Sequence, residues 1–354
     1  MYNTCILTNE TNSTYQRFNT EELGAEDISI AQHRDFENRN DYILGLTKKI
    51  EDWLTNNRSS IRYNIFNLPK MTGGFREIKA PEDELKAFMK EIKLHLENIG
   101  ILSHDSAYAY ISNRDCKKAI QCHQRNESNW FLKMDIEKFF NNCSEEVISS
   151  QLRKIYPFSL MVKADYDNFI RVLCDLSCYE NELPQGTPLS PILTNWLMIS
   201  IDAEITKALA SIPNQDYVYT RYADDLLISS KLPFRYEDIV NLVKGILRLE
   251  GTPFVIKDTK TRYGSKAGKN WNLGIMYNKD HNLTVGHKRK RRIKTMLFQF
   301  YQGQRDRDYA LELNGELAYL KNIEPEYCDY LLNFMGNKYR FNFKRAINIA
   351  IKQR

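Results

Sequence analysis

The stretch Tyr219-Thr-Arg-Tyr-Ala-Asp-Asp-Leu-Leu-Ile-Ser229 decides the fold of this 354-residue chain. Aromatic and β-branched residues precede its two adjacent acids, Asp224 and Asp225, and an apolar run follows them. Both flanks have the composition of β-strands. A turn between two such strands would place both carboxylates at the tip of a hairpin. An Asp-Asp pair by itself is more typical of a solvated turn, so its meaning depends on the rest of the chain.

A third acid stands in a similar setting. Asp135 comes at the end of the β-rich run Trp130-Phe-Leu-Lys-Met-Asp-Ile136. If the two runs are neighbouring strands, Asp135, Asp224 and Asp225 surround one point. Clustered carboxylates repel one another, and a divalent cation such as magnesium, which prefers oxygen ligands, removes that cost. Three carboxylates around a pair of metal ions is the arrangement that in-line phosphoryl transfer needs.

Composition places the chain among folded globular proteins, with 42% hydrophobic and 12% aromatic residues. Lysine and arginine total 50 against 45 acids, and five consecutive cations, residues 288–292, stand in the last third. Nucleic-acid phosphate is the expected partner of such a run. The seven cysteines show no repeated metal-binding spacing. We therefore expect reduced thiols in the cytoplasm. We also expect no signal peptide and no membrane span.

Periodicity and turn residues predict an alternation of helices and short strands. Two Pro-containing or Gly-containing segments interrupt it, a hairpin tip at Gly73-Gly74 and the loop 183–191. The predicted elements are helix 28–57, hairpin 61–78, a helix from Pro81 to Gly100, strand 130–136, helical 145–178, helix 192–209, the acidic hairpin, helix 236–249, strands 270–276 and 282–285, and a helical region from 286.

Three motifs together resemble motifs A, B and C of reverse transcriptases, in the same order and with similar spacing. They are Met134-Asp-Ile-Glu-Lys-Phe-Phe140, Leu183-Pro-Gln-Gly-Thr-Pro-Leu-Ser-Pro191 and Arg221-Tyr-Ala-Asp-Asp-Leu226. The resemblance is closest to the bacterial enzymes related to group II introns and retrons, and it extends over roughly residues 60–300. It implies an RNA-directed DNA polymerase, a nucleotidyltransferase, with an α+β right-hand fold. The expected domains are an N-terminal helical extension 1–60, fingers 61–130, a palm with an antiparallel sheet 131–285 (with a fingers segment around 145–180), and a helical thumb 286–354.

The resemblance also implies roles for the acidic residues. Asp135 and Asp224 would bind two Mg²⁺ ions, for which Mn²⁺ is expected to substitute, and Asp225 would complete the cluster. The backbone of Ile136 would face the metal and the phosphates. Lys260 would be the general acid that protonates pyrophosphate, although an exposed structural lysine fits its position nearly as well.

Other residues would form the nucleotide site by the same resemblance. Lys70 and Arg76 would grip the triphosphate, and Phe140 would be the steric gate that excludes a 2′-hydroxyl. Gln185 and Gly186 would line the incoming nucleotide. The remaining assignments are Tyr222 near the primer end, and Lys288, Arg289, Lys290, Arg291 and Arg292 against the template–primer backbone.

Departures from the relatives favour one subtype. Retron enzymes carry Val-Thr-Gly where this chain has Trp271-Asn-Leu-Gly274, and Asn-Ala-x-x-His where it has Lys118-Ala-Ile-Gln-Cys-His123. We also expect no maturase or endonuclease domain. These features favour a stand-alone reverse transcriptase of the phage-defence-associated groups. Its expected partners are a non-coding RNA template, a DNA product or primer, dNTPs and an accessory defence protein, with no membrane.

Four alternatives stay open at this point. One is a retron enzyme that makes RNA-linked single-stranded DNA. A second is an RNA-dependent RNA polymerase, which Phe140 disfavours. A third is a non-catalytic RNA-binding module, which the presence of all three acids disfavours. The fourth is untemplated or protein-primed synthesis from a tyrosine hydroxyl, and with 21 tyrosines the sequence does not name the residue.

Overall fold

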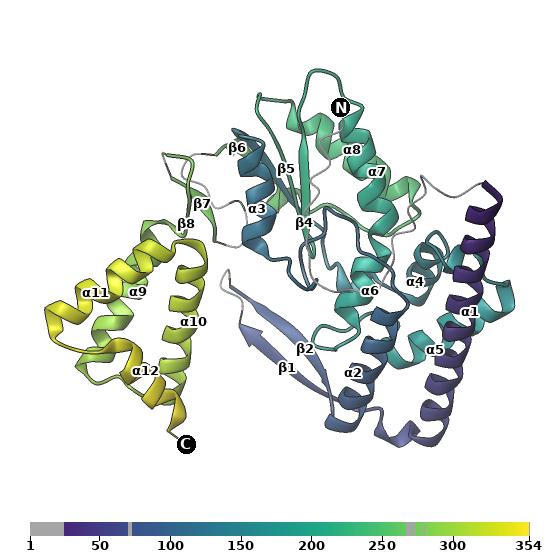
Figure 1. Ribbon diagram of the computed structural model, residues 1–354, viewed down its shortest axis with the longest axis horizontal. Coiled ribbons are helices and arrows are strands. Elements are labelled where there is room, and N and C mark those ends of the chain that lie inside the picture. The colour runs from purple at the N-terminus through teal and green to yellow at the C-terminus, as the bar shows by residue number, and fades with distance from the viewer. Residues whose placement is uncertain (1–24, 70–72, 267–270, 272–273, 279, 354) are drawn as a thin grey trace.

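A four-stranded antiparallel sheet forms the centre of the computed structural model, which describes residues 25–353 apart from 70–72, 267–270, 272–273 and 279 (Figure 1). The strand order is β4-β5-β3-β6. The strands are β3 (Trp130–Asp135), β4 (Val218–Tyr222), β5 (Asp225–Ser230) and β6 (Arg262–Ser265). The two runs that carry the acids are therefore adjacent strands, as the sequence predicts.

Both faces of this sheet are covered. Alternate residues of a strand point to opposite faces, and here Leu132 and Leu226 join one apolar core while Phe131 and Leu227 join another. The first core is completed by helices α4 (Glu145–Leu152), α5 (Lys163–Ser177), α6 (Ser190–Leu197), α7 (Ile199–Ala210) and α8 (Tyr236–Leu249). Consecutive apolar residues, such as Phe131–Leu132 in β3 and Leu226–Leu227 in β5, reflect this burial on both sides.

The prediction of one helix over 192–209 was wrong in one respect. The segment forms two helices, α6 and α7, which meet at Met198. The backbone of Met198 has φ −91° and ψ −3°, outside the helical values, and its side chain is buried. No glycine or proline marks this position, so the local pattern gave no sign of the break.

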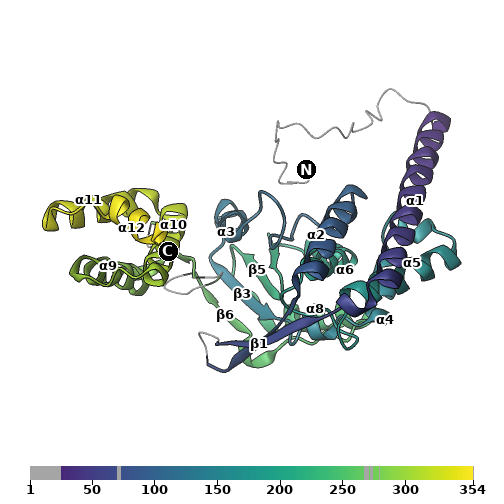
Figure 2. The ribbon, with the colours of Figure 1, turned by 90° about the horizontal axis from the view of Figure 1, so that it is seen from below.

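A two-stranded hairpin projects from the helical part of the molecule. Strands β1 (Tyr63–Pro69) and β2 (Phe75–Pro81) pair antiparallel, and Figure 2 shows the hairpin extending from the foot of α2 (Asp83–Asn98). The helix expected to start at Pro81 starts at Asp83, because Pro81 is the last residue of β2. Helix α1 (Ala25–Asn56) packs against α5 at the far end of the molecule.

The C-terminal helices form a separate bundle on the other side of the sheet (Figures 1 and 2). They are α9 (Gly286–Gln302), α10 (Arg307–Ile323), α11 (Pro325–Tyr339) and α12 (Phe343–Lys352). Their core includes Phe131 and Leu227 of the sheet and Ile120 of α3 (Cys116–Arg125). Two short strands precede the bundle, β7 (Met276–Tyr277) and β8 (Leu283–Thr284). The strand predicted over 282–285 is therefore shorter than expected, and the one predicted over 270–276 lies partly outside the described residues. Among the described residues, no helix is long and apolar enough to cross a membrane.

Candidate active site

The turn between β4 and β5 is tight. Only Ala223 and Asp224 separate the strands, and Ala223 has a left-handed backbone with φ +56°. A left-handed residue other than glycine is uncommon and needs support from its surroundings. Arg221 supplies support, because its Nη1 donates a hydrogen bond of 3.3 Å to the carbonyl oxygen of Ala223.

Strand pairing brings the third acid to this turn. Asp135, the last residue of β3, stands opposite Asp225, the first residue of β5. The amide of the next residue, Ile136, donates a 2.9 Å hydrogen bond to the carbonyl oxygen of Asp224. Asp135 is buried, and Asp224 and Asp225 are half-buried. The three carboxylates predicted to share one site are thus carried by two paired strands and the turn between β4 and β5.

Two lysines balance part of this charge. Lys260 Nζ lies 2.6 Å from Asp135 Oδ1, and Lys133 Nζ lies 2.7 Å from Asp225 Oδ2. Asp224 forms no ion pair within the described residues. Burial raises the pKa of Asp224 to about 6, and the negative charges of Asp225 and Asp135 add to the effect. A carboxylate that is both desolvated and surrounded by like charge is the group that a cation would stabilise most.

The donor set fits a hard divalent cation. Carboxylate and carbonyl oxygens are the ligands that Mg²⁺ and Mn²⁺ prefer. Within the described residues, no three acidic, histidine or cysteine side chains already converge as a ligand cluster. The ammonium groups of Lys260 and Lys133 each hold one carboxylate oxygen, of Asp135 and Asp225 respectively. A bound cation would have to compete with them.

The pKa of Asp224 predicts how cation binding depends on pH. Because the folded carboxyl holds its proton up to about pH 6, against 3.8 for the unfolded group, ionisation of Asp224 destabilises the metal-free fold as pH rises through this interval. A cation must displace that proton, so binding should weaken as pH falls below 6. We expect Mg²⁺ or Mn²⁺ to raise the melting temperature more at about pH 7.5 than at about pH 5.5. An equal increase at both pH values would contradict this assignment.

A buried ion pair holds the base of the turn. The guanidinium of Arg221 makes paired hydrogen bonds to Asp202 of α7, at 3.0 Å from Nε and 2.8 Å from Nη2, and both side chains are almost fully buried. Tyr219 donates to the same carboxylate at 2.7 Å, and Asn195 Oδ1 accepts from Arg221 at 3.2 Å. Neither Asp202 nor Asn195 belongs to a motif that the sequence reveals. Only their polarity inside the apolar pattern of 192–209 signals them.

His123 supports the two strands through α3. Its ring nitrogens lie 2.8 Å from Thr220 Oγ1 on β4 and 2.6 Å from Ser229 Oγ on β5. Burial lowers the pKa of His123 to about 3, so the ring is neutral at physiological pH. His123 is therefore a buried crosslink between elements.

The loop predicted to line the nucleotide is joined to the base of the hairpin. The amide of Lys79 on β2 donates a 2.9 Å hydrogen bond to the carbonyl oxygen of Gln185. Gly186 has φ +112°, and a Cβ there would lie 2.8 Å from Ile78 Cγ2. A glycine is required at this position by the packing of the loop against β2. The ion pair between Lys79 and Glu182, at 2.7 Å, strengthens the same junction.

The other residues predicted for the nucleotide site differ in their exposure to solvent. Arg76 is exposed on β2, and Tyr222 is half-buried at the end of β4. Phe140 is half-buried, with its ring 5.7 Å from that of Phe139 in an edge-on contact. Lys70 lies outside the described residues.

The five basic residues of α9 divide into two sets. Arg289, Lys290 and Arg292 form ion pairs with Glu316, Glu324 and Glu312, respectively, within the C-terminal bundle. Lys288 and Arg291 are exposed, form no ion pair with a described residue and, together with Arg292, line a groove of about 540 Å³ between α9 and α10. Lys288 and Arg292 share a helix face because they are four residues apart, so only ion pairing separates them.

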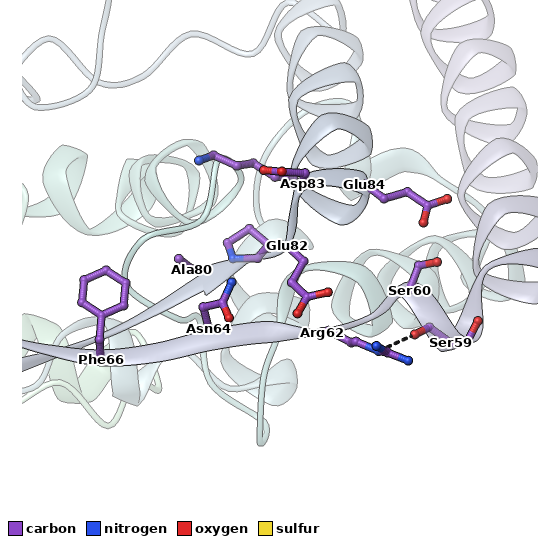
Figure 3. Close-up of a pocket in the computed structure, with 11 residues that line it drawn as sticks. Ser59, Ser60, Arg62, Asn64, Phe66, Ala80, Glu82, Asp83 and Glu84 are labelled. Atoms are coloured by element: carbon purple, nitrogen blue, oxygen red, sulfur yellow. Dashed lines mark hydrogen bonds between the residues drawn. The ribbon is translucent and has the colours of Figure 1, made fainter. Parts of the chain in front are cut away.

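A larger cavity, of about 700 Å³, lies elsewhere, at the outer base of the hairpin (Figure 3). Side chains of both charges line it, including Arg62, Glu82 and Asp83. None of the predicted site residues lines this cavity, so it is distinct from the acidic site.

An antiparallel sheet that carries paired acids, with a hairpin on one side and a helical bundle on the other, defines a right-hand nucleic-acid polymerase. The family described as reverse transcriptase (RNA-dependent DNA polymerase) matches residues 68–293, and the chain belongs to this family. It is an RNA-directed DNA polymerase, a class that copies RNA into DNA and generally uses divalent metal ions.

Similar proteins identify the branch of the family. The chain is 28% identical over 294 residues to the retron Ec83 reverse transcriptase of Escherichia coli, covering 79% of this chain and 89% of that protein. It is 26% identical to the retron Ec73 reverse transcriptase of the same species, covering 74% and 83%. The protein is thus a bacterial, retron-like reverse transcriptase. A solved telomerase from Candida tropicalis aligns with 13% identity and a TM-score of 0.48 over 82% of this chain, which spans 61% of that one.

Proposed function

We propose that the protein extends a primer on an RNA template by two-metal phosphoryl transfer at Asp135, Asp224 and Asp225. One observation carries the proposal, namely the register that sets Asp135 opposite Asp225 and beside the turn. When bound, two Mg²⁺ ions would activate the primer 3′-hydroxyl and stabilise the departing pyrophosphate. Asp135 and Asp224, with the carbonyl of Ile136, would hold them, and Mn²⁺ would substitute.

The two lysines have separate roles in this proposal. Lys133 holds Asp225 in place by its 2.7 Å contact. Burial lowers the pKa of Lys260, but its hydrogen bond to Asp135 and the charges of the three acids outweigh burial and raise it. Lys260 therefore stays protonated at the edge of the site, and it can donate its proton to the leaving pyrophosphate.

The nucleotide would enter between the hairpin and the sheet. Lys70 and Arg76 would bind the triphosphate, Gln185 and Gly186 would line the base and sugar, and Tyr222 would contact the primer end. Phe140 would pack under the sugar and leave no space for a 2′-hydroxyl.

Phe140→Ala provides the test of sugar selection. Removing the ring should reduce the preference for dNTPs over rNTPs by about 10- to 100-fold, the usual worth of a steric contact in a specificity pocket. The measurement is kcat/KM for dGTP and GTP on one RNA template. Phe298→Ala, which removes a ring on α9 that is 37% exposed, is the matched control and should leave the ratio unchanged. A wild-type preference for rNTPs would overturn the assignment of DNA synthesis.

We assign the template–primer contact to the C-terminal bundle as a thumb. Lys288 and Arg291 are the cations free to meet phosphates, whereas Arg289, Lys290 and Arg292 would contribute by shaping the bundle. The proposed domains are the N-terminal extension 1–60, fingers 61–130, palm 131–285 and thumb 286–354. Such contacts are sequence-independent and weaken with salt.

The biological role divides into two proposals. The sequence departures favour a stand-alone enzyme of anti-phage defence that copies a non-coding RNA, with an accessory protein. The similarity to retron reverse transcriptases favours the alternative, synthesis of single-stranded DNA linked to RNA. Sequencing the nucleic acid that copurifies with the protein separates them. Branched RNA–DNA molecules would support the retron role, DNA copies unlinked to RNA would support the first, and DNA joined to a tyrosine would indicate protein priming.

A further inference from the structure

A short segment runs along the free edge of β4, next to the acidic turn. Ala107 pairs in parallel with Arg221, the Tyr108 amide donates a 2.8 Å hydrogen bond to the Arg221 carbonyl, and the Arg221 amide donates one of 2.6 Å to Ser106. Tyr110 follows three residues after Ala107, in the turn that ends this segment, and its phenol lies within electrostatic range of Asp224 and Tyr222.

The backbone at Tyr110 is held in an unfavourable conformation. Its φ is +62°, the left-handed region that a bulky aromatic residue rarely adopts. The preceding residue is anchored, because buried Asn195 donates a 2.8 Å hydrogen bond to the carbonyl of Ala109. Arg114 donates another, also 2.8 Å, to the carbonyl of Ala107. Strain of this kind persists where surrounding contacts impose it, and it concentrates at functional sites.

The side chain faces the acidic site without a protein partner. Tyr110 is 53% exposed, and no hydrogen bond or ring contact joins it to another described residue. Burial of part of the phenol raises the pKa of Tyr110, and the charges of Asp224 and Tyr222 add to this, while Arg76 opposes it. The ring therefore lies within electrostatic reach of the turn on one side and of the hairpin cation on the other, and it is neutral at physiological pH.

We infer that Tyr110 is a stacking residue that positions the nascent base pair between the hairpin and the catalytic turn. The inference rests on the proposed function, and it adds a substrate contact that none of the three motifs contains. An exposed, neutral ring without a protein partner suits the face of a nucleobase, which every base presents. The left-handed backbone sets the direction of the side chain, because a right-handed conformation at this residue would point the ring elsewhere.

Three variants test this inference in primer extension with one RNA template and one dNTP. Tyr110→Ala should raise the KM for dNTP by about 5- to 100-fold, the usual loss for one base stack, with a smaller change in kcat. Tyr110→Phe should keep the KM within about 3-fold of the wild-type value, because the ring is kept.

Tyr110→Gly tests the strain of the backbone. It should raise the melting temperature, because glycine relieves the strain, and yet impair KM as much as Ala. Leu102→Ala, which truncates a side chain that is 85% exposed near the same segment, is the control and should behave as wild type.

The outcomes separate this inference from the proposed function. If wild type makes no DNA, or makes it independently of Asp224, the proposed function fails. If wild-type synthesis depends on Asp224 but Tyr110→Ala leaves KM unchanged, only the stacking role is overturned. A Phe variant as impaired as Ala would also overturn it, since the hydroxyl would then be the active group. A Gly variant that lowers the melting temperature would show a structural side chain and overturn it as well.

Discussion

Simultaneous replacement of Asp224 and Asp225 by Ala is expected to abolish DNA synthesis while RNA binding remains. Asp225 and Asp135 lie close enough to Asp224 for their charges to raise its pKa, which burial already raises, to about 6. Loss of ligands to a catalytic metal forfeits several kcal/mol of transition-state stabilisation, which corresponds to a decrease of at least about 1,000-fold in rate. The measurement is primer extension with Mg²⁺ and with Mn²⁺, alongside a filter-binding isotherm for the same RNA.

Two further variants make this result specific. Asp224→Asn keeps the size of the side chain and removes its charge, so it should be nearly as inactive as Ala. Asp216→Asn removes an exposed acid at the other end of β4, where Asp216 lies 4.0 Å from Lys231, and should retain wild-type activity. Synthesis that survives the double Ala variant would show that the metal site lies elsewhere. Parallel loss of RNA binding and of the melting transition would instead indicate a folding defect, and Asp224→Asn would then decide the question.

Asp202→Ala should be the most destabilising single change near the site. It leaves the guanidinium of Arg221 buried without a counterion and removes the acceptor for Tyr219. Breaking one partner of a buried ion pair costs about 3–5 kcal/mol in free energy of unfolding. Activity should fall with it, because Arg221 also holds the carbonyl of Ala223 at the tip of the hairpin. Urea denaturation followed by circular dichroism measures the first effect, and primer extension the second.

The same helix offers a matched control. Glu204 pairs with Lys207 at 3.7 Å on the exposed side of α7, and Glu204→Ala should change the free energy of unfolding by less than about 0.5 kcal/mol. Replacing both buried partners, as Asp202→Leu with Arg221→Met, should recover much of the lost stability, since apolar pairs often substitute for buried ion pairs. It should not recover activity, because the contact to Ala223 is gone. Equal, small effects of Asp202→Ala and Glu204→Ala would refute the supporting role of this pair.

Much of the active site could be predicted because its parts are local. The composition of 217–228 marks two strands and a turn, and the β3 run before Asp135 has the same character. Asp224 and Asp225 follow from the turn itself. To predict that β3 and β5 are neighbours, one had to assume only that similar apolar strands share a sheet. The observed pairing of β3 with β5 confirms this prediction.

Other features depend on residues far apart in the chain, and no local pattern encodes them. Asp202 is one of several polar residues on a helix, and only the packing of α7 under β4 makes it the partner of Arg221. Lys133 is an ordinary lysine until the sheet places it beside Asp225, and the pairing of Lys260 with Asp135 likewise depends on the tertiary structure. Gly186 is expected to let the backbone approach a nucleotide, and the structure adds two further reasons for a glycine, its φ of +112° and the 2.8 Å approach of a Cβ to Ile78 of the hairpin.

The amino-acid sequence by itself determined the class of the protein, because three acids in ordered motifs and alternating apolar strands suffice to specify a polymerase sheet. The tertiary structure decided which charged side chains are paired within the protein and which are exposed without an ion-pair partner among the described residues. It directs Lys288 and Arg291 outward and commits Arg289, Lys290 and Arg292 to glutamates of the bundle. It also leaves Asp224 without an ammonium partner among the described residues. The physical reason is that the pairing of a charge depends on how helices rotate and strands order around the core, which are long-range properties of packing.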